Sequence, residues 1–335
     1  MVFTFPSTFI VLYVEFFKND FEGFVSNSVL IVGGDNEYGN SSENLFTNPD
    51  CHVPNFHNNN CAHSLSLSAG DHKVLSCGGT NNGHVCHELR PQIGQWTWHS
   101  TMTNNRTYST AMSMPNGIYI FGGFDSTTTT DFLPKSSKVW QAGPNMQGEG
   151  FWYGCGVKIS NTEIVLIGGT ASKNIVIKYN TKTKGWKSMP NLLQGRWAHG
   201  CALINKKIIA SGGKNSYKNT NWFTHLKSTE IIPITNFVSR FGGDLNTQRS
   251  GFGMLAVGVR FPRVLAMGGY SANSGPSDSI EVWNDDEEKW TIAPFSLRNP
   301  HYYFAYLSLP EITMCSKEPL LQVKLDNINE LEPFT

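Results

Sequence analysis

The sequence predicts an all-β protein built from repeated four-stranded units, and three observations lead there. First, only 16% of the 335 residues are charged, against about 25% in typical soluble domains, whereas aromatic residues reach 12% and glycines number 32. This composition argues against disorder and coiled coils, and it favours short strands joined by tight turns. Second, a mostly apolar run ending in Gly-Gly recurs six times. Third, a Trp follows several of these doublets at a constant distance from an earlier apolar residue.

The six glycine doublets predict buried strands that stop at a turn. They are Gly33-Gly34, Gly78-Gly79, Gly122-Gly123, Gly168-Gly169, Gly212-Gly213 and Gly268-Gly269. Successive doublets lie 44 to 46 residues apart, except for an interval of 56 before the last. Glycine adopts positive φ without strain and lets a neighbouring backbone approach closely, so the doublets are predicted to be structural.

A hairpin is predicted after most doublets, because an apolar residue and a Trp flank a turn-like segment. The pairs are Leu89/Trp96, Leu133/Trp140, Tyr179/Trp186 and Trp283/Trp290. We interpret the tryptophans Trp96, Trp140, Trp186 and Trp290 as packing between repeats, since buried aromatic rings dominate protein cores. The first and fifth repeats lack a clear Trp at this position.

A further strand is predicted before each doublet, so that each period holds four strands. It is opened by Asn60-Cys61-Ala62-His63, Arg106-Thr107-Tyr108, Phe151-Trp152-Tyr153-Gly154, Arg196-Trp197-Ala198-His199 and Arg249-Ser250-Gly251. Together these marks resemble the kelch repeat over roughly residues 28–309. The resemblance implies a six-bladed β-propeller, within the galactose-oxidase-like superfamily, with one four-stranded blade per repeat.

The order of the strands predicts how the two ends of the propeller meet. One extra strand, residues 301–309, follows the last Trp with no doublet after it. We expect it to join the N-terminal blade and close the ring, because closure removes exposed sheet edges. Residues 8–17 are the alternative source of this strand. The predicted divisions are an N-terminal tail or signal segment over 1–20, the propeller over 21–310 and a C-terminal tail over 311–335. The interval of 56 residues predicts loop insertions between Gly213 and Gly269.

Seven cysteines give two pairs that are close in sequence, Cys51/Cys61 and Cys77/Cys86. Both are disulfide candidates, with Cys77–Cys86 expected to span a hairpin. Cys155 and Cys201 lie inside apolar strands and are expected to be buried free thiols. Asn40 and Asn105 begin N-glycosylation sequons. These features slightly favour an extracellular location, which the sequence otherwise leaves open.

Motifs for catalysis, cofactors or metal are not found in the sequence. It contains no Gly-x-Ser-x-Gly, His-Glu-x-x-His or P-loop. His84, Cys86 and His87 share one loop, but no second ligand pair accompanies them, so no metal and no cofactor is predicted. Lys+Arg and Asp+Glu both number 26, which argues against nucleic-acid binding, and no apolar run is long enough to span a membrane.

The function that the sequence favours is a non-enzymatic module that binds another protein through loops on one propeller face. The resemblance implies the same role, since protein recognition is the usual task of kelch repeats. The alternative is a carbohydrate-binding or carbohydrate-active propeller that uses a central pocket, as in galactose oxidase and sugar mutarotases. Arg106, Arg196 and Arg249 are weak binding candidates, because recurrence at one repeat position also fits hydrogen bonding within the fold.

Overall fold

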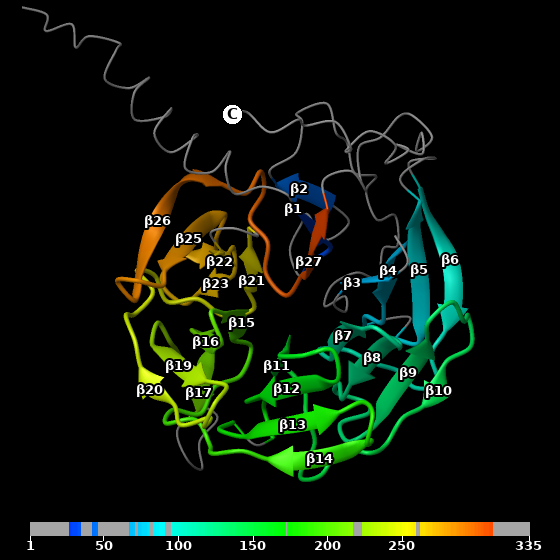
Figure 1. The fold of residues 1–335 in the computed structure, drawn as a ribbon. Coiled ribbons are helices and arrows are strands. Elements are labelled where there is room, and N and C mark those ends of the chain that lie inside the picture. Colours follow the sequence, from blue (N-terminus) through cyan, green and yellow to red (C-terminus); the bar gives the residue numbers. More distant parts are fainter. Residues whose placement is uncertain are drawn as a thin grey trace, which may run out of the picture.

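A computed structural model describes residues 27–34, 42–45, 67–70, 73–80, 83–90, 95–171, 173–216, 223–258 and 262–310. All regular structure in these residues is β-strand. The sheets stand around a central axis; in each four-stranded sheet the first strand is innermost and the last lies at the rim (Figure 1). This arrangement is that of a β-propeller.

Five sheets have four antiparallel strands each and are the blades of the propeller. In sequence order they are β3 (Leu67–Gly70), β4 (Lys73–Cys77), β5 (Val85–Arg90) and β6 (Gln95–Thr101); β7 (Thr110–Met114), β8 (Gly117–Phe121), β9 (Thr130–Pro134) and β10 (Gln141–Ala142); β11 (Cys155–Lys158), β12 (Glu163–Ile167), β13 (Val176–Asn180) and β14 (Gly185–Ser188); β15 (Gly200–Ile204), β16 (Lys207–Ser211), β19 (Thr229–Pro233) and β20 (Arg240–Phe241); and β21 (Gly253–Val257), β22 (Arg263–Met267), β25 (Ser279–Asn284) and β26 (Lys289–Ser296).

The prediction of six four-stranded blades is wrong for the described residues. The remaining sheet has three strands, in the order β2 (Ser42–Leu45), β1 (Asn27–Val32) and β27 (Ala305–Pro310). The sequence following β2, which would have to supply a fourth strand, lies outside the described residues. The pairing of the chain ends is as expected, because β27 pairs antiparallel with β1 from Asn27↔Pro310 to Val32↔Ala305. Residues 8–17, the alternative, lie outside the described residues.

The glycine doublets connect neighbouring blades. The second glycine of a doublet donates its N–H to a carbonyl just before the next inner strand, as in Gly123 to Phe151 at 2.8 Å and Gly169 to Arg196 at 3.0 Å. The first glycine lies against the same carbonyl. At Gly122, whose φ is +63°, an added Cβ would lie 1.8 Å from the Phe151 oxygen. The doublet is therefore required both by backbone conformation and by close approach.

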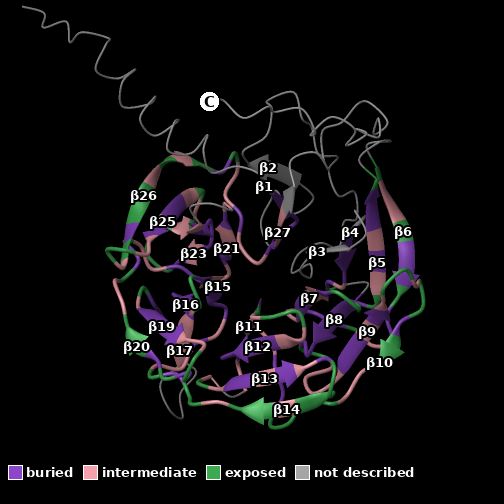
Figure 2. Ribbon diagram, in the orientation of Figure 1, coloured by how far each residue is buried: buried purple, intermediate pink, exposed green. Residues whose placement is uncertain are grey.

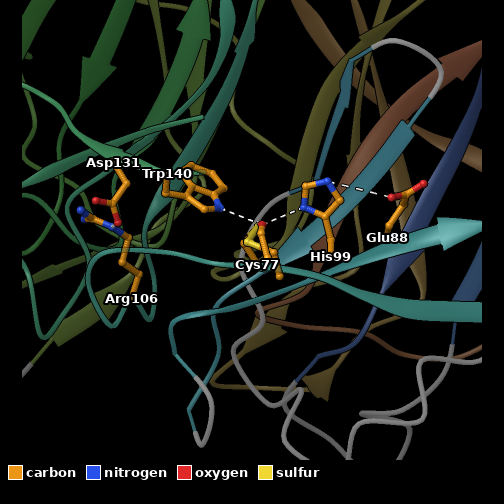
Figure 3. Close-up of a disulfide and its surroundings, with 8 residues drawn as sticks. Cys77, Glu88, His99, Arg106, Asp131 and Trp140 are labelled. Carbon is orange, nitrogen blue, oxygen red and sulfur yellow. Dashed lines mark hydrogen bonds and ion pairs between the residues drawn. A yellow bond between two sulfur atoms is a disulfide. The ribbon is translucent and has the colours of Figure 1, made fainter. Parts of the chain in front are cut away.

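Three of the repeat tryptophans, Trp140, Trp186 and Trp290, contact the preceding blade, as predicted. Leu89↔Trp96, Tyr179↔Trp186 and Trp283↔Trp290 are cross-strand pairs. Trp140 donates to Ser100 Oγ of the preceding blade at 3.0 Å, beside the Cys77–Cys86 disulfide (Figure 3). The central strands of the blades are buried, whereas rim strands such as β14 are largely exposed (Figure 2). Apolar clusters join each blade to the next, from the blade that begins with β3 to the sheet that contains β1.

The long fifth interval contains a small hairpin rather than only loops. It consists of β17 (Lys214–Ser216) and β18 (Phe223–His225), directly after the Gly212-Gly213 doublet. A second small hairpin, β23 (Tyr270–Ser271) with β24 (Gly275–Pro276), follows the last doublet. Both project from the same end of their blades, which is the end where the inner strands begin.

Candidate binding site at the mouth of the central cavity

The inner strands surround a cavity of about 420 Å³. Its volume is in the range of small-molecule sites. Strands β7, β11, β15, β21 and β27 all contribute to its wall, which is largely apolar. Representative lining residues are Met112, Val157, Leu203, Met254 and Tyr306. We call the end at which these strands begin the mouth of the cavity.

Five equivalent residues, one before each of these inner strands, form the rim of the mouth. These belt residues are Tyr108, Tyr153, Ala198, Gly251 and Tyr303. Four hydrogen bonds join them in order, with each N–H after Tyr108 donating to the carbonyl of the preceding belt residue: Tyr153→Tyr108 at 2.9 Å, Ala198→Tyr153 at 2.7 Å, Gly251→Ala198 at 2.8 Å and Tyr303→Gly251 at 2.7 Å. All five have positive φ, between 50° and 61°. The belt therefore joins four blades and the three-stranded sheet through backbone atoms alone.

The three belt tyrosines converge on one another over the cavity. Tyr108 and Tyr153 stack with their ring centroids 3.7 Å apart, and Tyr303 lies 5.8 Å and 5.3 Å from them. The Tyr303 ring extends over Gly251, where an added Cβ would lie 2.7 Å from it. The small residues Ala198 and Gly251 thus leave one side of the mouth without a ring of its own.

A second group of aromatic side chains surrounds Lys214 on that side. Its Nζ lies 5.0 Å from the ring centroid of Trp197, 4.5 Å from that of Phe223 and 5.9 Å from that of Tyr303. The ammonium also donates to the Tyr303 hydroxyl at 3.4 Å. Phe223 is 46% exposed, so this cation–aromatic group reaches the surface. We call Lys214, Trp197, Phe223 and Tyr303 the lysine cage.

Electrostatics at the cage follow from partial burial of its cation. Burial lowers the pKa of Lys214, because desolvation disfavours the ammonium. The pKa of neighbouring His225 is also lowered, first by burial and then by the Lys214 charge, against a raising hydrogen bond to the Tyr270 carbonyl. Both shifts favour the uncharged form of the side chain.

The three arginine candidates lie inside the blades rather than at the mouth. Arg106, Arg196 and Arg249 are almost wholly buried, and none lines the cavity. Each donates to the carbonyl of the first doublet glycine in its own blade. Each also pairs with a carboxylate on the third strand, in the pairs Arg106–Asp131, Arg196–Glu230 and Arg249–Glu281 at 3.0, 3.0 and 2.7 Å. Their guanidinium groups therefore bond to groups inside the blades and do not face the cavity.

Two sheets carry a different residue at the arginine position. In the blade that begins with β11, Phe151 occupies the arginine position, and it packs in one apolar cluster with Ile177 of the third strand. In the sheet that joins the chain ends, His301 takes that position and its Nδ1 lies 3.1 Å from the Gly33 oxygen. In this sheet an imidazole, in place of a guanidinium, contacts the first doublet glycine.

The cysteine predictions have mixed outcomes. Cys77 and Cys86 form the expected disulfide, so the Cys86 thiol considered with His84 and His87 is not a free metal ligand. The expectation that Cys155 and Cys201 are free thiols is wrong, because they form a second disulfide. They occupy equivalent places on the adjacent inner strands β11 and β15, where their Cα atoms are 5.9 Å apart, within bonding range. This disulfide borders the cavity.

Asn105 of the second sequon is exposed, and its Oδ1 lies 2.8 Å from His84 Nδ1. Asn40, Cys51, Cys61, the predicted tails over 1–20 and 311–335 and the strand opening at Asn60 lie outside the described residues. Within the described part of the chain, no cluster of three or more His, Cys, Asp or Glu side chains could hold a metal ion. That part also contains no helix with the length and apolarity needed to cross a membrane.

The lysine cage and the belt were not among the predicted site residues. The belt carried a weak signal, since its members stand two residues after the recurring Arg106, Arg196 and Arg249. The cage carried none, because its members come from three separate parts of the chain.

Comparison with known proteins supports the fold. No protein-family model matches the chain. Among solved structures it is similar to the one titled "Structure of YjhT", with a TM-score of 0.67 and 13% identity, over 81% of this chain and 97% of that one. At this identity the similarity concerns the fold alone, and with the sheet arrangement it supports the assignment of the chain as a β-propeller.

Proposed function

We propose that this protein is a non-enzymatic recognition module that binds a protein partner through the face around the mouth of the central cavity. The observation that carries the proposal is the concentration of aromatic side chains there. Phe124 and Trp152 pack edge to face at 6.4 Å, and Trp197 and Phe223 do so at 5.9 Å. Phe124 is 62% exposed. Exposed aromatic side chains beside a cation are typical of the residues that dominate protein-binding energy.

We further propose that the propeller is of the kelch type, with six blades in a closed ring. In this arrangement the sheet β2-β1-β27 is the sixth blade. Strand β27 packs against β21 on one side and β3 on the other, which supports closure. The repeated contact between the residue at the arginine position and the doublet glycine extends to His301 and Gly33, which supports a common repeat. The two disulfides support an oxidising compartment for the protein.

A carbohydrate ligand is the second candidate, because aromatic rings over a cavity also stack on sugars. It requires several polar side chains that converge on the bound ring. The buried positions of Arg106, Arg196 and Arg249 remove the residues expected to supply them. The protein partner therefore has the stronger support.

The proposal is tested by placing a photo-crosslinking phenylalanine derivative at Phe223. A matched control carries the same group at Phe241, which is 53% exposed but lies on the rim strand β20. We expect a protein from the native tissue to be crosslinked from position 223 and not from 241, and to be lost when Trp197→Ala is added. Equal crosslinking from both positions, or binding to a glycan array without any crosslinked protein, would refute the proposal.

A further inference from the structure

Lys214 is held in place by its backbone rather than by a counter-ion. It follows the Gly212-Gly213 doublet and opens β17. Its N–H donates to the Trp197 carbonyl at 2.8 Å, and its carbonyl accepts from the Trp197 N–H at 3.0 Å. These two bonds fix the start of its side chain beside the indole, and its Nζ then lies over the rings of the cage. The position of the ammonium is therefore preorganised before any ligand arrives.

This ammonium lacks a carboxylate among the described residues. Other cations of the propeller have one, as in Lys178–Glu163 at 2.7 Å and Lys207–Asp285 at 2.9 Å. Lys214 instead meets ring faces and one hydroxyl. Ring faces attract a cation, but they do not neutralise it. An anion that bound beside this half-buried charge would therefore be stabilised by pairing with it.

The surroundings of the ammonium favour a carboxylate with an apolar neighbour. Phe223 offers an exposed ring on the same side as the charge, and Trp197 and Tyr303 supply further ring surface. The Tyr303 hydroxyl is the one polar side-chain group, among the described residues, to which the ammonium is hydrogen-bonded. A sugar would need more hydrogen-bonding partners than this, whereas an acidic residue flanked by apolar side chains needs one cation and ring surface.

We propose that the lysine cage is a subsite for an acidic peptide segment. In it, Lys214 pairs with a Glu or Asp carboxylate of the partner, while Phe223 and Trp197 contact the adjacent apolar side chain. This inference rests on the proposed function and adds the chemistry of the partner. It also assigns the β17–β18 hairpin as a specificity element, because the hairpin supplies two of the four cage residues.

The test uses two matched pools of capped, fluorescently labelled hexapeptides. In the first pool a central Glu is flanked by Phe, Leu or Trp, and in the second the Glu is replaced by Gln. Binding is measured by fluorescence anisotropy with the full chain and with the variants Lys214→Gln, Lys214→Arg and Lys182→Gln. Lys182 is an exposed lysine in the β13–β14 turn and serves as the control.

We expect the unaltered protein to bind the Glu pool about tenfold more tightly than the Gln pool, the size of one charge-assisted contact. Lys214→Gln should abolish this preference, and Lys214→Arg and Lys182→Gln should keep it. Raised salt should weaken only the Glu pool. Thermal unfolding of each variant shows that the fold is retained.

Three results would overturn the inference, and they bear differently on the proposed function. Equal affinity for both pools, lost in Phe223→Ala, rejects the carboxylate subsite but leaves protein binding intact. A Glu preference that survives in Lys214→Gln places the anion contact elsewhere and has the same effect. Binding of neither pool, together with binding of a hexuronic-acid oligosaccharide, rejects both the inference and the proposed function.

Discussion

Replacing Arg196 by Met should strongly destabilise the propeller, because it strands a buried carboxylate. Arg196 and its partner Glu230 are both fully buried, with their N–O distance at 3.0 Å. Removal of one member of such a pair costs about 3–5 kcal/mol. The lower end applies here, since Glu230 keeps hydrogen bonds from the Leu193 and Gln194 N–H groups at 2.8 and 3.0 Å. We therefore expect a loss of about 3 kcal/mol in the free energy of unfolding.

The double variant Arg196→Met with Glu230→Ile should recover at least half of this loss. It imitates the neighbouring blade, where Phe151 and Ile177 fill the corresponding positions. Apolar residues commonly replace a buried ion pair at little cost. Urea titration followed by Trp fluorescence gives the free energies from the midpoints and slopes.

The control is Arg240→Met, which removes the exposed Arg240–Glu288 pair at the rim. It should cost less than about 1 kcal/mol. The reasoning fails if Arg196→Met costs no more than this control. It also fails if the double variant is as unstable as the sum of its single changes.

Three further predictions concern backbone, disulfide and pH. Gly122→Ala should destabilise more than Gly148→Ala, since both have positive φ but only at Gly122 would the Cβ meet a neighbouring backbone; thermal unfolding compares them. Replacing Cys155 and Cys201 by Ala should cost about 4 kcal/mol by the chain-entropy relation for the separation of 46 residues, measured by urea unfolding after mass spectrometry has verified the intact bond in the parent. Burial and the Arg196 charge hold the pKa of His199 well below 6.5. Below about pH 6.5 His199 is therefore protonated in the unfolded chain but still neutral in the native state. Stability should fall as pH drops below about 6.5, by up to about 1.4 kcal/mol per unit, and His199→Phe should flatten that slope in unfolding titrations from pH 7 to 5.

The repeat marks predicted the strand scaffold because each mark serves a local requirement. A doublet such as Gly122-Gly123 is needed wherever the backbone turns against the next blade, so it recurs with the period. The Tyr179↔Trp186 pair likewise follows from one hairpin. The number of four-stranded blades was not predicted correctly for the described residues, since the sheet β2-β1-β27 has three strands there.

Contacts between repeats were harder to predict because the period hides them. Cys155 and Cys201 are 46 residues apart, the same interval as the doublets ending at Gly123 and Gly169. That coincidence places them side by side on adjacent inner strands, and it was the available signal for the disulfide. Burial inside apolar strands, the feature that predicted free thiols, does not indicate the distance between the two cysteines.

The lysine cage could not be predicted from a local sequence pattern, because its residues are far apart in the chain. Lys214 follows Trp197 by 17 residues, and Tyr303 is separated from Lys214 by 89. Only the arrangement of blades around the cavity brings these side chains together. The insertion after Gly213 was predicted as a loop, since three-residue strands such as β17 and β18 leave almost no periodic signal.

At the belt positions the hydrogen bonds of the fold do not determine which side chain is present. The belt hydrogen bonds use only N–H and C=O groups, so the fold makes no demand on the side chain except tolerance of positive φ. Glycine meets that demand without strain, as Gly251 does, whereas a tyrosine with φ near 50° is held at a cost of about 1–3 kcal/mol. Tyr108, Tyr153 and Tyr303 nevertheless occupy three of the five positions. The belt hydrogen bonds do not require these rings, so their presence over the cavity supports the proposed use of the mouth in recognition.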